Sequence, residues 1–227
     1  MSKIYAIANQ KGGVGKTTSC VNLAASLVAT KKRVLLVDLD PQGNATMGSG
    51  INKNELELSV YDLLTGRSEP AACLVLSNSG QYQVLPSNGD LTAAEVEMLN
   101  LEHKEHRLDK ALKKLEPQFD YILIDCPPSV GHLTQTALAA SSEVFMPIQC
   151  EYFAMEGLTQ MIEVIRGVMQ TRPGKLSFGG ILLTMYDPSL ELTAEVEAEV
   201  REFAPRPLSC PPQDPRGPYT TCRVTLN

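Results

Sequence analysis

The sequence of 227 residues contains no tryptophan, and aromatic residues make up only 5% of it. A hydrophobic core must therefore be aliphatic, and hydrophobic residues are plentiful at 43%, which excludes a wholly disordered chain. No run approaches the roughly 18 to 20 apolar residues that a membrane-spanning helix needs. The N-terminal residues MSKIYAIANQ also lack a basic segment followed by an apolar stretch and a cleavage site. These absences predict a cytoplasmic protein.

Closely spaced cysteines are absent too. The six cysteines are spread along the chain without a CxxC pair, which favours free thiols over a secreted disulfide framework. Acidic residues outnumber basic ones, which gives a net charge of -6 and an isoelectric point near 5.2. This net charge argues against a protein that coats nucleic acid through its overall charge, so any DNA binding must be confined to a local surface.

Apolar stretches rich in isoleucine and valine alternate with helical patterns along most of the chain. The candidate strands cover residues 4–8, 33–40, 82–86, 120–128, 143–149 and 178–185. The candidate helices cover residues 16–30, 59–65, 91–99, 102–116, 131–141, 154–170 and 189–203. Because parallel strands need crossover connections, this order predicts an α/β fold with a mainly parallel sheet and helices on both faces. Ligands of such sheets bind at the carboxyl ends of the strands.

The C-terminal residues 204–227 break this pattern. They hold six of the chain's 15 prolines, which excludes a helix and a central strand. We therefore expect residues 1–203 to form one domain. Residues 204–227 are expected to be an irregular, proline-rich tail that is not part of the fold.

A glycine-rich loop directly follows the first predicted strand and opens the first predicted helix. The loop consists of Lys11, Gly12, Gly13, Val14, Gly15, Lys16, Thr17 and Thr18. Such a loop turns its backbone N–H groups toward an anion at the positive end of the helix. Lys16 can then reach the outer phosphates, the Thr17 hydroxyl can ligate Mg²⁺, and Thr18 can hydrogen-bond an inner phosphate. The loop deviates from the usual pattern, because Gln10 occupies the position of its first glycine.

Three aspartates lie where a nucleotide on this loop would need carboxylates. Asp38 and Asp40 end the second strand and, being two residues apart, point to the same face. Asp125 ends the apolar strand ILID, as a Walker B carboxylate does when it holds Mg²⁺ through water. Any one aspartate at a strand end can be a turn former or a helix cap. All three together favour a nucleotide site.

Four segments resemble the ParA-type chromosome and plasmid partition ATPases, within the ParA/MinD deviant-Walker group. They are KGGVGKTT, VLLVDLDPQGNAT, DYILIDCPPS and PIQCEYFAMEGL, and the match runs from about Lys3 to Phe203. The resemblance implies a P-loop NTPase that hydrolyses ATP with Mg²⁺.

The resemblance also implies roles for matching positions. Lys11 is similar to the signature lysine, which reaches across an ATP-bound dimer to the partner's phosphates. Lys16 and Thr17 resemble the usual loop lysine and Mg²⁺ ligand. Asp40 resembles the carboxylate that orients the attacking water, and Asp38 would support the Mg²⁺ region. Residues 151–157 resemble the segment that changes with nucleotide state.

The partners follow from the same resemblance. In such systems an ATP-bound homodimer binds DNA without sequence preference, and a ParB-type protein stimulates hydrolysis and releases the dimer. A nucleoid-associated protein is the resulting expectation, with chromosome or plasmid as the cargo.

The resemblance stops after Phe203, where family members continue into another strand and the closing helices. Here the chain reads APRPLSCPPQ instead, so we expect these closing C-terminal elements to be missing. We hypothesise a shifted reading frame; resequencing that finds an uninterrupted in-frame APRPLSCPP stretch would contradict it. The lost region supplies adenine contacts and much of the DNA-binding surface in the family.

Two alternative functions stay open at this point. One is a MinD-like, membrane-associated division regulator, which needs a C-terminal amphipathic anchor. Six prolines are incompatible with such a helix, so no stable membrane anchor is expected. The other is a crippled nucleotide binder whose activity is impaired by the altered C-terminus.

Overall fold

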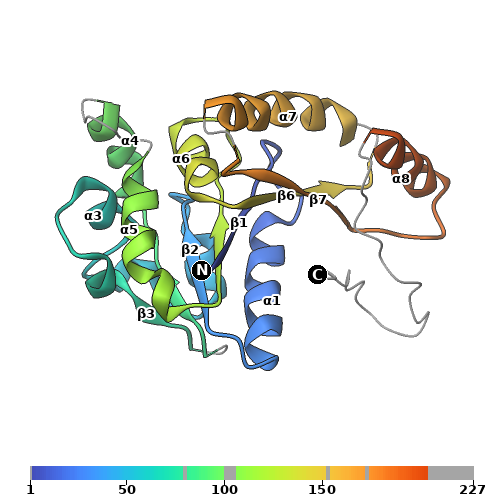
Figure 1. The fold of residues 1–227 in the computed structure, drawn as a ribbon. Helices are drawn as coiled ribbons and strands as arrows, with labels where there is room; N and C mark the ends of the chain where they lie inside the picture. The colour runs from blue at the N-terminus through green and yellow to red at the C-terminus, as the bar shows by residue number, and fades with distance from the viewer. Residues whose placement is uncertain (1, 79–80, 100–105, 152–153, 172–173, 204–227) are drawn as a thin grey trace.

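The computed structural model describes residues 2–78, 81–99, 106–151, 154–171 and 174–203. Its centre is a seven-stranded sheet of order β3-β4-β2-β5-β1-β6-β7 (Figure 1). The strands are β1 (Lys3–Ile7), β2 (Val34–Asp38), β3 (Val75–Leu76), β4 (Gln83–Leu85), β5 (Tyr121–Asp125), β6 (Glu143–Gln149) and β7 (Ser177–Thr184). Neighbouring strands are parallel except β3 and β4, which are antiparallel. The predicted α/β fold with a mainly parallel sheet is confirmed.

Helices cover both faces of this sheet. They are α1 (Lys16–Ala29), α2 (Asn44–Gly48), α3 (Val60–Thr65), α4 (Leu91–Leu99), α5 (Arg107–Leu115), α6 (His132–Ala140), α7 (Ala154–Thr171) and α8 (Glu191–Phe203). The short 3₁₀ segments are η1 (Lys53–Glu55), η2 (Pro70–Cys73) and η4 (Glu116–Gln118). In Figure 1, α6 and α7 lie above the sheet and α1 lies below it.

The core consists of two hydrophobic clusters, one on each face of the sheet. Along β1, Ile4 and Ala6 contribute to one cluster, whereas Tyr5 and Ile7 contribute to the other. This alternation follows from the period of two in a β-strand. Helix α1 adds its buried residues to the Tyr5 cluster, and helices α5, α6 and α7 add theirs to the Ile4 cluster. Because both faces are covered, the central strands β1, β2 and β5 are apolar apart from charged residues at their ends.

The register of the central strands sets the position of the site. Ile7 of β1 and Asp38 of β2 both pair with Asp125 of β5. The carboxyl ends of these three strands therefore end level with one another, and the loop from β1 to α1 begins at the same edge. The polar residues at the ends of these strands therefore lie close together at this edge of the sheet.

The shortest elements were not predicted, among them α2 and β3. Helix α2 has five residues, and β3 has two, so neither is long enough to show a hydrophobic period. The predicted helix 102–116 corresponds to α5, and its first residues lie outside the described part of the chain, as does the tail 204–227. Among the described residues, no helix is long and apolar enough to cross a membrane.

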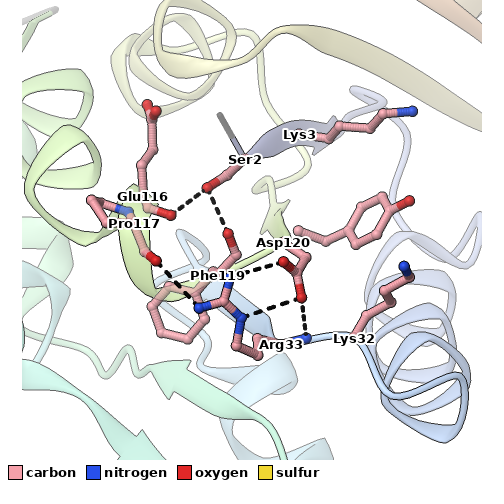
Figure 2. A pocket seen from close by; sticks show the side chains of 9 residues that line it. Ser2, Lys3, Lys32, Arg33, Glu116, Pro117, Phe119 and Asp120 are labelled. Carbon is pink, nitrogen blue, oxygen red and sulfur yellow. Dashed lines mark hydrogen bonds and ion pairs between the residues drawn. The ribbon is translucent and has the colours of Figure 1, made fainter.

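A charged clamp joins the amino ends of β2 and β5, opposite the site. Asp120 accepts hydrogen bonds from the backbone N–H of Arg33 at 2.8 Å and from its guanidinium Nη2 at 2.8 Å (Figure 2). Arg33 also donates to the Pro117 carbonyl, at 3.3 Å. These residues line a pocket of about 550 Å³. The Arg33 hydrogen bonds lower the pKa of Asp120 from 3.8 to about 2.

The clamp should give a pH-dependent contribution to stability. A carboxyl whose pKa is depressed on folding stabilises the protein above its unfolded value, and this contribution is lost as the pH falls from about 4 toward 2. Asp120→Asn should therefore lower the midpoint of urea unfolding at pH 7, and its difference from the unmodified protein should shrink at pH 3. Glu57→Gln, at an exposed carboxylate outside the clamp, is the control. A deficit that is equal at both pH values would contradict this prediction.

Candidate nucleotide site

The predicted phosphate loop has the backbone that an anion site requires. Gly13 and Gly15 have φ angles of 76° and 88°, in the left-handed region that favours glycine. Helix α1 begins at Lys16 with no side-chain hydrogen bond capping its N-terminus. The first N–H groups of an uncapped helix have no intrahelical acceptor, so they can bind an anion. Gly12, Gly13 and Thr18 are exposed, and Val14 is buried.

Two side chains that the sequence reasoning missed hold this loop in place. The Asn9 amide donates to the Pro147 carbonyl at 2.7 Å and accepts from the Lys11 backbone N–H at 3.0 Å. At the far side of the loop, the Thr184 hydroxyl donates to the Val14 carbonyl at 2.8 Å. The loop is thus fixed from β6 and β7.

Lys16 lies inside the loop, with only 7% of its surface exposed. Its ammonium donates to the Lys11 carbonyl at 2.8 Å. Burial lowers the pKa of Lys16, and the nearby Asp125 opposes that shift. A cation in this place can exchange a carbonyl partner for a phosphate oxygen.

The Lys11 side chain has a different partner from that of Lys16. Its ammonium forms an ion pair with Glu151, which follows β6 in the same chain. Both side chains are about one-third exposed. The resemblance pointed to residues 151–157 but gave Glu151 no role, because no pattern in the neighbouring sequence links Glu151 to the phosphate loop.

Asp38 and Asp125 form a pair of buried carboxylates on adjacent strands. Both are 0% exposed, and their Cα positions are paired in the register of β2 and β5. Burial raises the pKa of each carboxyl, and the charge of Asp38 further raises that of Asp125. The Thr17 hydroxyl donates to Asp125 Oδ2 at 2.7 Å. The structure therefore brings together all three residues that were predicted to serve the metal.

These residues fit a hydrated Mg²⁺ ion. Asp125 Oδ1 is buried and has no hydrogen-bond partner within the described chain. A buried unpaired carboxylate oxygen is costly, and a cation or its water would satisfy it. Among the described residues, no group of three or more His, Cys, Asp or Glu could hold a metal ion alone. Mg²⁺ is commonly bound by one or two protein oxygens together with phosphates and waters.

Asp40 lies just beyond the end of β2 and is 7% exposed. Its backbone N–H donates to Asp38 Oδ1 at 3.0 Å, and its carboxylate Oδ1 accepts from the Gln42 N–H at 2.9 Å. The negative charge of Asp40 favours the protonated form of Lys16. The site thus contains three carboxylates and a buried lysine at one edge of the sheet.

A phosphate loop opening α1, beside buried carboxylates at the carboxyl ends of β2 and β5, defines a P-loop nucleotide-binding domain. A family model described as an AAA domain matches residues 2–178. The chain is 46% identical over 203 residues to the chromosome partitioning protein ParA of Myxococcus xanthus, covering 89% of this chain and 72% of that relative. The chain belongs to the ParA/Soj family of partition ATPases.

Two further proteins support this relationship. The sporulation initiation inhibitor protein Soj of Bacillus subtilis is 46% identical over 203 residues, covering 89% of this chain and 80% of Soj. A Mycobacterium smegmatis structure, described as cobyrinic acid a,c-diamide synthase with bound ATP analogue and magnesium, is similar with a TM-score of 0.88. It is 40% identical, with 93% of this chain and 86% of that chain covered.

The adjacent buried carboxylates should destabilise the protein when no cation is bound. The pKa of Asp125 is raised to about 7, so the cost of its charge appears as the pH rises above 3.8 and is complete above about 7. Asp125→Asn removes this charge and keeps an oxygen that accepts from Thr17. In EDTA and without nucleotide, the variant should melt a few degrees higher than the unmodified protein at pH 8, with a smaller difference at pH 5. A variant that is less stable at pH 8 would contradict this prediction.

Proposed function

We propose that this chain is an ATP-hydrolysing, dimerising switch that drives DNA partitioning. The observation that carries the proposal is the Thr17–Asp125 hydrogen bond beside the unpartnered Asp125 Oδ1. A hydroxyl and a carboxylate with one free oxygen therefore lie next to the phosphate loop, and both could bind a hydrated cation. The ATP analogue and magnesium in the M. smegmatis structure support ATP and Mg²⁺ as the ligands.

In the proposed mechanism, the triphosphate binds along the loop and the first turn of α1. Lys16 exchanges the Lys11 carbonyl for phosphate oxygens, which places its charge where negative charge accumulates. Thr17 would ligate Mg²⁺, and Asp38 and Asp125 would hold the ion through water. When bound, Mg²⁺ neutralises phosphate charge during transfer.

Hydrolysis requires positioning of the water more than covalent chemistry by the protein. Asp40 orients the attacking water at the edge of the site. Lys11 reaches the phosphates of a second copy, and in the single chain it pairs with Glu151 instead. Formation of the ATP-bound dimer therefore includes the release of Lys11 from Glu151.

The cycle would act on DNA through this dimer. The ATP-bound form binds DNA without sequence preference and is nucleoid-associated, and a ParB-type partner stimulates hydrolysis. The partition names of the M. xanthus relative and its family support this assignment. Because the net charge is -6, the DNA contact must be a local basic surface.

Complementation between two inactive variants tests the shared site. Lys11→Ala and Lys16→Ala should each lose most ATP hydrolysis, by about a hundredfold or more, because each removes a charge from the transferred phosphoryl group. In a mixed dimer, the Lys11→Ala subunit keeps its own Lys16 and receives Lys11 from the other subunit. An equimolar mixture should therefore recover a substantial fraction of the unmodified rate in an assay of phosphate release.

Several outcomes would contradict the proposal. Absence of recovery in mixtures that do form dimers would show that Lys11 does not act on a second copy. Equal rates for the unmodified chain and Lys16→Ala would contradict ATP hydrolysis by this site. Turnover that requires added cobyrinic acid would instead support the activity named for the M. smegmatis protein.

A further inference from the structure

The Asp38 carboxylate accepts three hydrogen bonds in the protein interior. Oδ2 accepts two of them, from the Thr46 backbone N–H at 2.8 Å and from the Thr46 hydroxyl at 2.7 Å. Oδ1 accepts one, from the Asp40 N–H at 3.0 Å. Each carboxylate oxygen has about two acceptor positions. Oδ2 is therefore saturated, and Oδ1 keeps capacity for one further hydrogen bond.

The direction of the Thr46 hydroxyl is fixed by a second contact. Thr46 lies in α2 and is 0% exposed. Its oxygen accepts the backbone N–H of Ser87, just beyond β4, at 2.9 Å. Because a hydroxyl has one proton and Asp38 Oδ2 is a charged acceptor, that proton is directed at Asp38. The chain from Ser87 through Thr46 to Asp38 joins β4, α2 and β2.

The result is a matched pair of available oxygens on neighbouring strands. On β5, Asp125 Oδ2 accepts from Thr17 while Oδ1 has no partner in the described part of the chain. On β2, Asp38 has Oδ2 saturated by Thr46 and Oδ1 partly available. Each carboxylate thus has one oxygen tied by a threonine and the other able to accept from water.

We propose that Thr46 is a positioning residue of the Mg²⁺ site. It fixes the Asp38 carboxylate so that Oδ1 accepts from the hydration shell of the ion. Thr46 acts only through Asp38 and touches neither nucleotide nor metal. This inference rests on the proposed binding of Mg-ATP by the same site.

The test is a binding titration of a fluorescent, non-hydrolysable ATP analogue at increasing Mg²⁺. Thr46→Val removes the hydroxyl at nearly constant shape, and Thr46→Ser retains it. Loss of a residue that orients a metal-supporting carboxylate commonly costs about 10- to 100-fold in metal affinity. Thr46→Val should raise the half-saturating Mg²⁺ concentration by about tenfold or more, with analogue affinity in EDTA unchanged. Thr46→Ser should stay within about threefold of the unmodified protein.

Thr136→Val is the matched control. Thr136 is also 0% exposed, lies on α6, and its hydroxyl has no hydrogen-bond partner in the described chain. This variant should leave the Mg²⁺ titration unchanged. Thermal melting confirms that each variant is folded, and Thr46→Ala against Thr46→Ser isolates the hydroxyl if the valine variant does not fold.

Two results would overturn the proposal. One is a folded Thr46→Val or Thr46→Ala variant with the Mg²⁺ dependence of the unmodified protein. The other is a change in EDTA that equals the change in Mg²⁺, because a purely structural defect would weaken both. If the unmodified protein bound no analogue under any condition, that result would instead contradict the proposed function on which this inference rests.

Discussion

The structure around the site depends on two carboxylates that are forced together in the protein interior. The parallel register of β2 and β5 pairs Asp38 with Asp125, and neither side chain reaches solvent. Buried like charges oppose each other, and burial alone disfavours the ionised forms. Thr46 and Thr17 offset part of this cost by donating hydrogen bonds to one carboxylate each. A bound cation would offset much of the remainder, so ligand binding and local stability are coupled.

The phosphate loop is exposed at Gly12 and Gly13, and the sheet holds it from outside. Asn9 links it to the Pro147 carbonyl of β6, and Thr184 at the end of β7 links to Val14. Lys11 is held separately, by Glu151. The two loop lysines therefore have different partners. Lys16 lies within its own loop, while Lys11 is paired outside it and becomes available only when that ion pair opens.

Most of the fold and the central residues of the site could be predicted from the sequence. Helix periodicity located α1, α6 and α7, and the loop motif with the aspartates at strand ends identified Lys16, Thr17 and Asp125. The supporting residues could not be found in this way. Asn9 and Thr184 act on residues 138 and 170 positions away, and such pairings exist only after the sheet has formed. Thr46 lies on a five-residue helix without a detectable period.

In the proposed cycle, Mg-ATP joins two copies of this chain through the site. Light scattering on a sizing column, with Asp40→Ala to block hydrolysis, measures this directly. We expect one chain of 24.7 kDa without nucleotide and twice that mass with Mg-ATP. A single-chain mass under both conditions, for a folded variant shown to bind ATP, would contradict the claim. The protein would then bind nucleotide without acting as a dimerising switch.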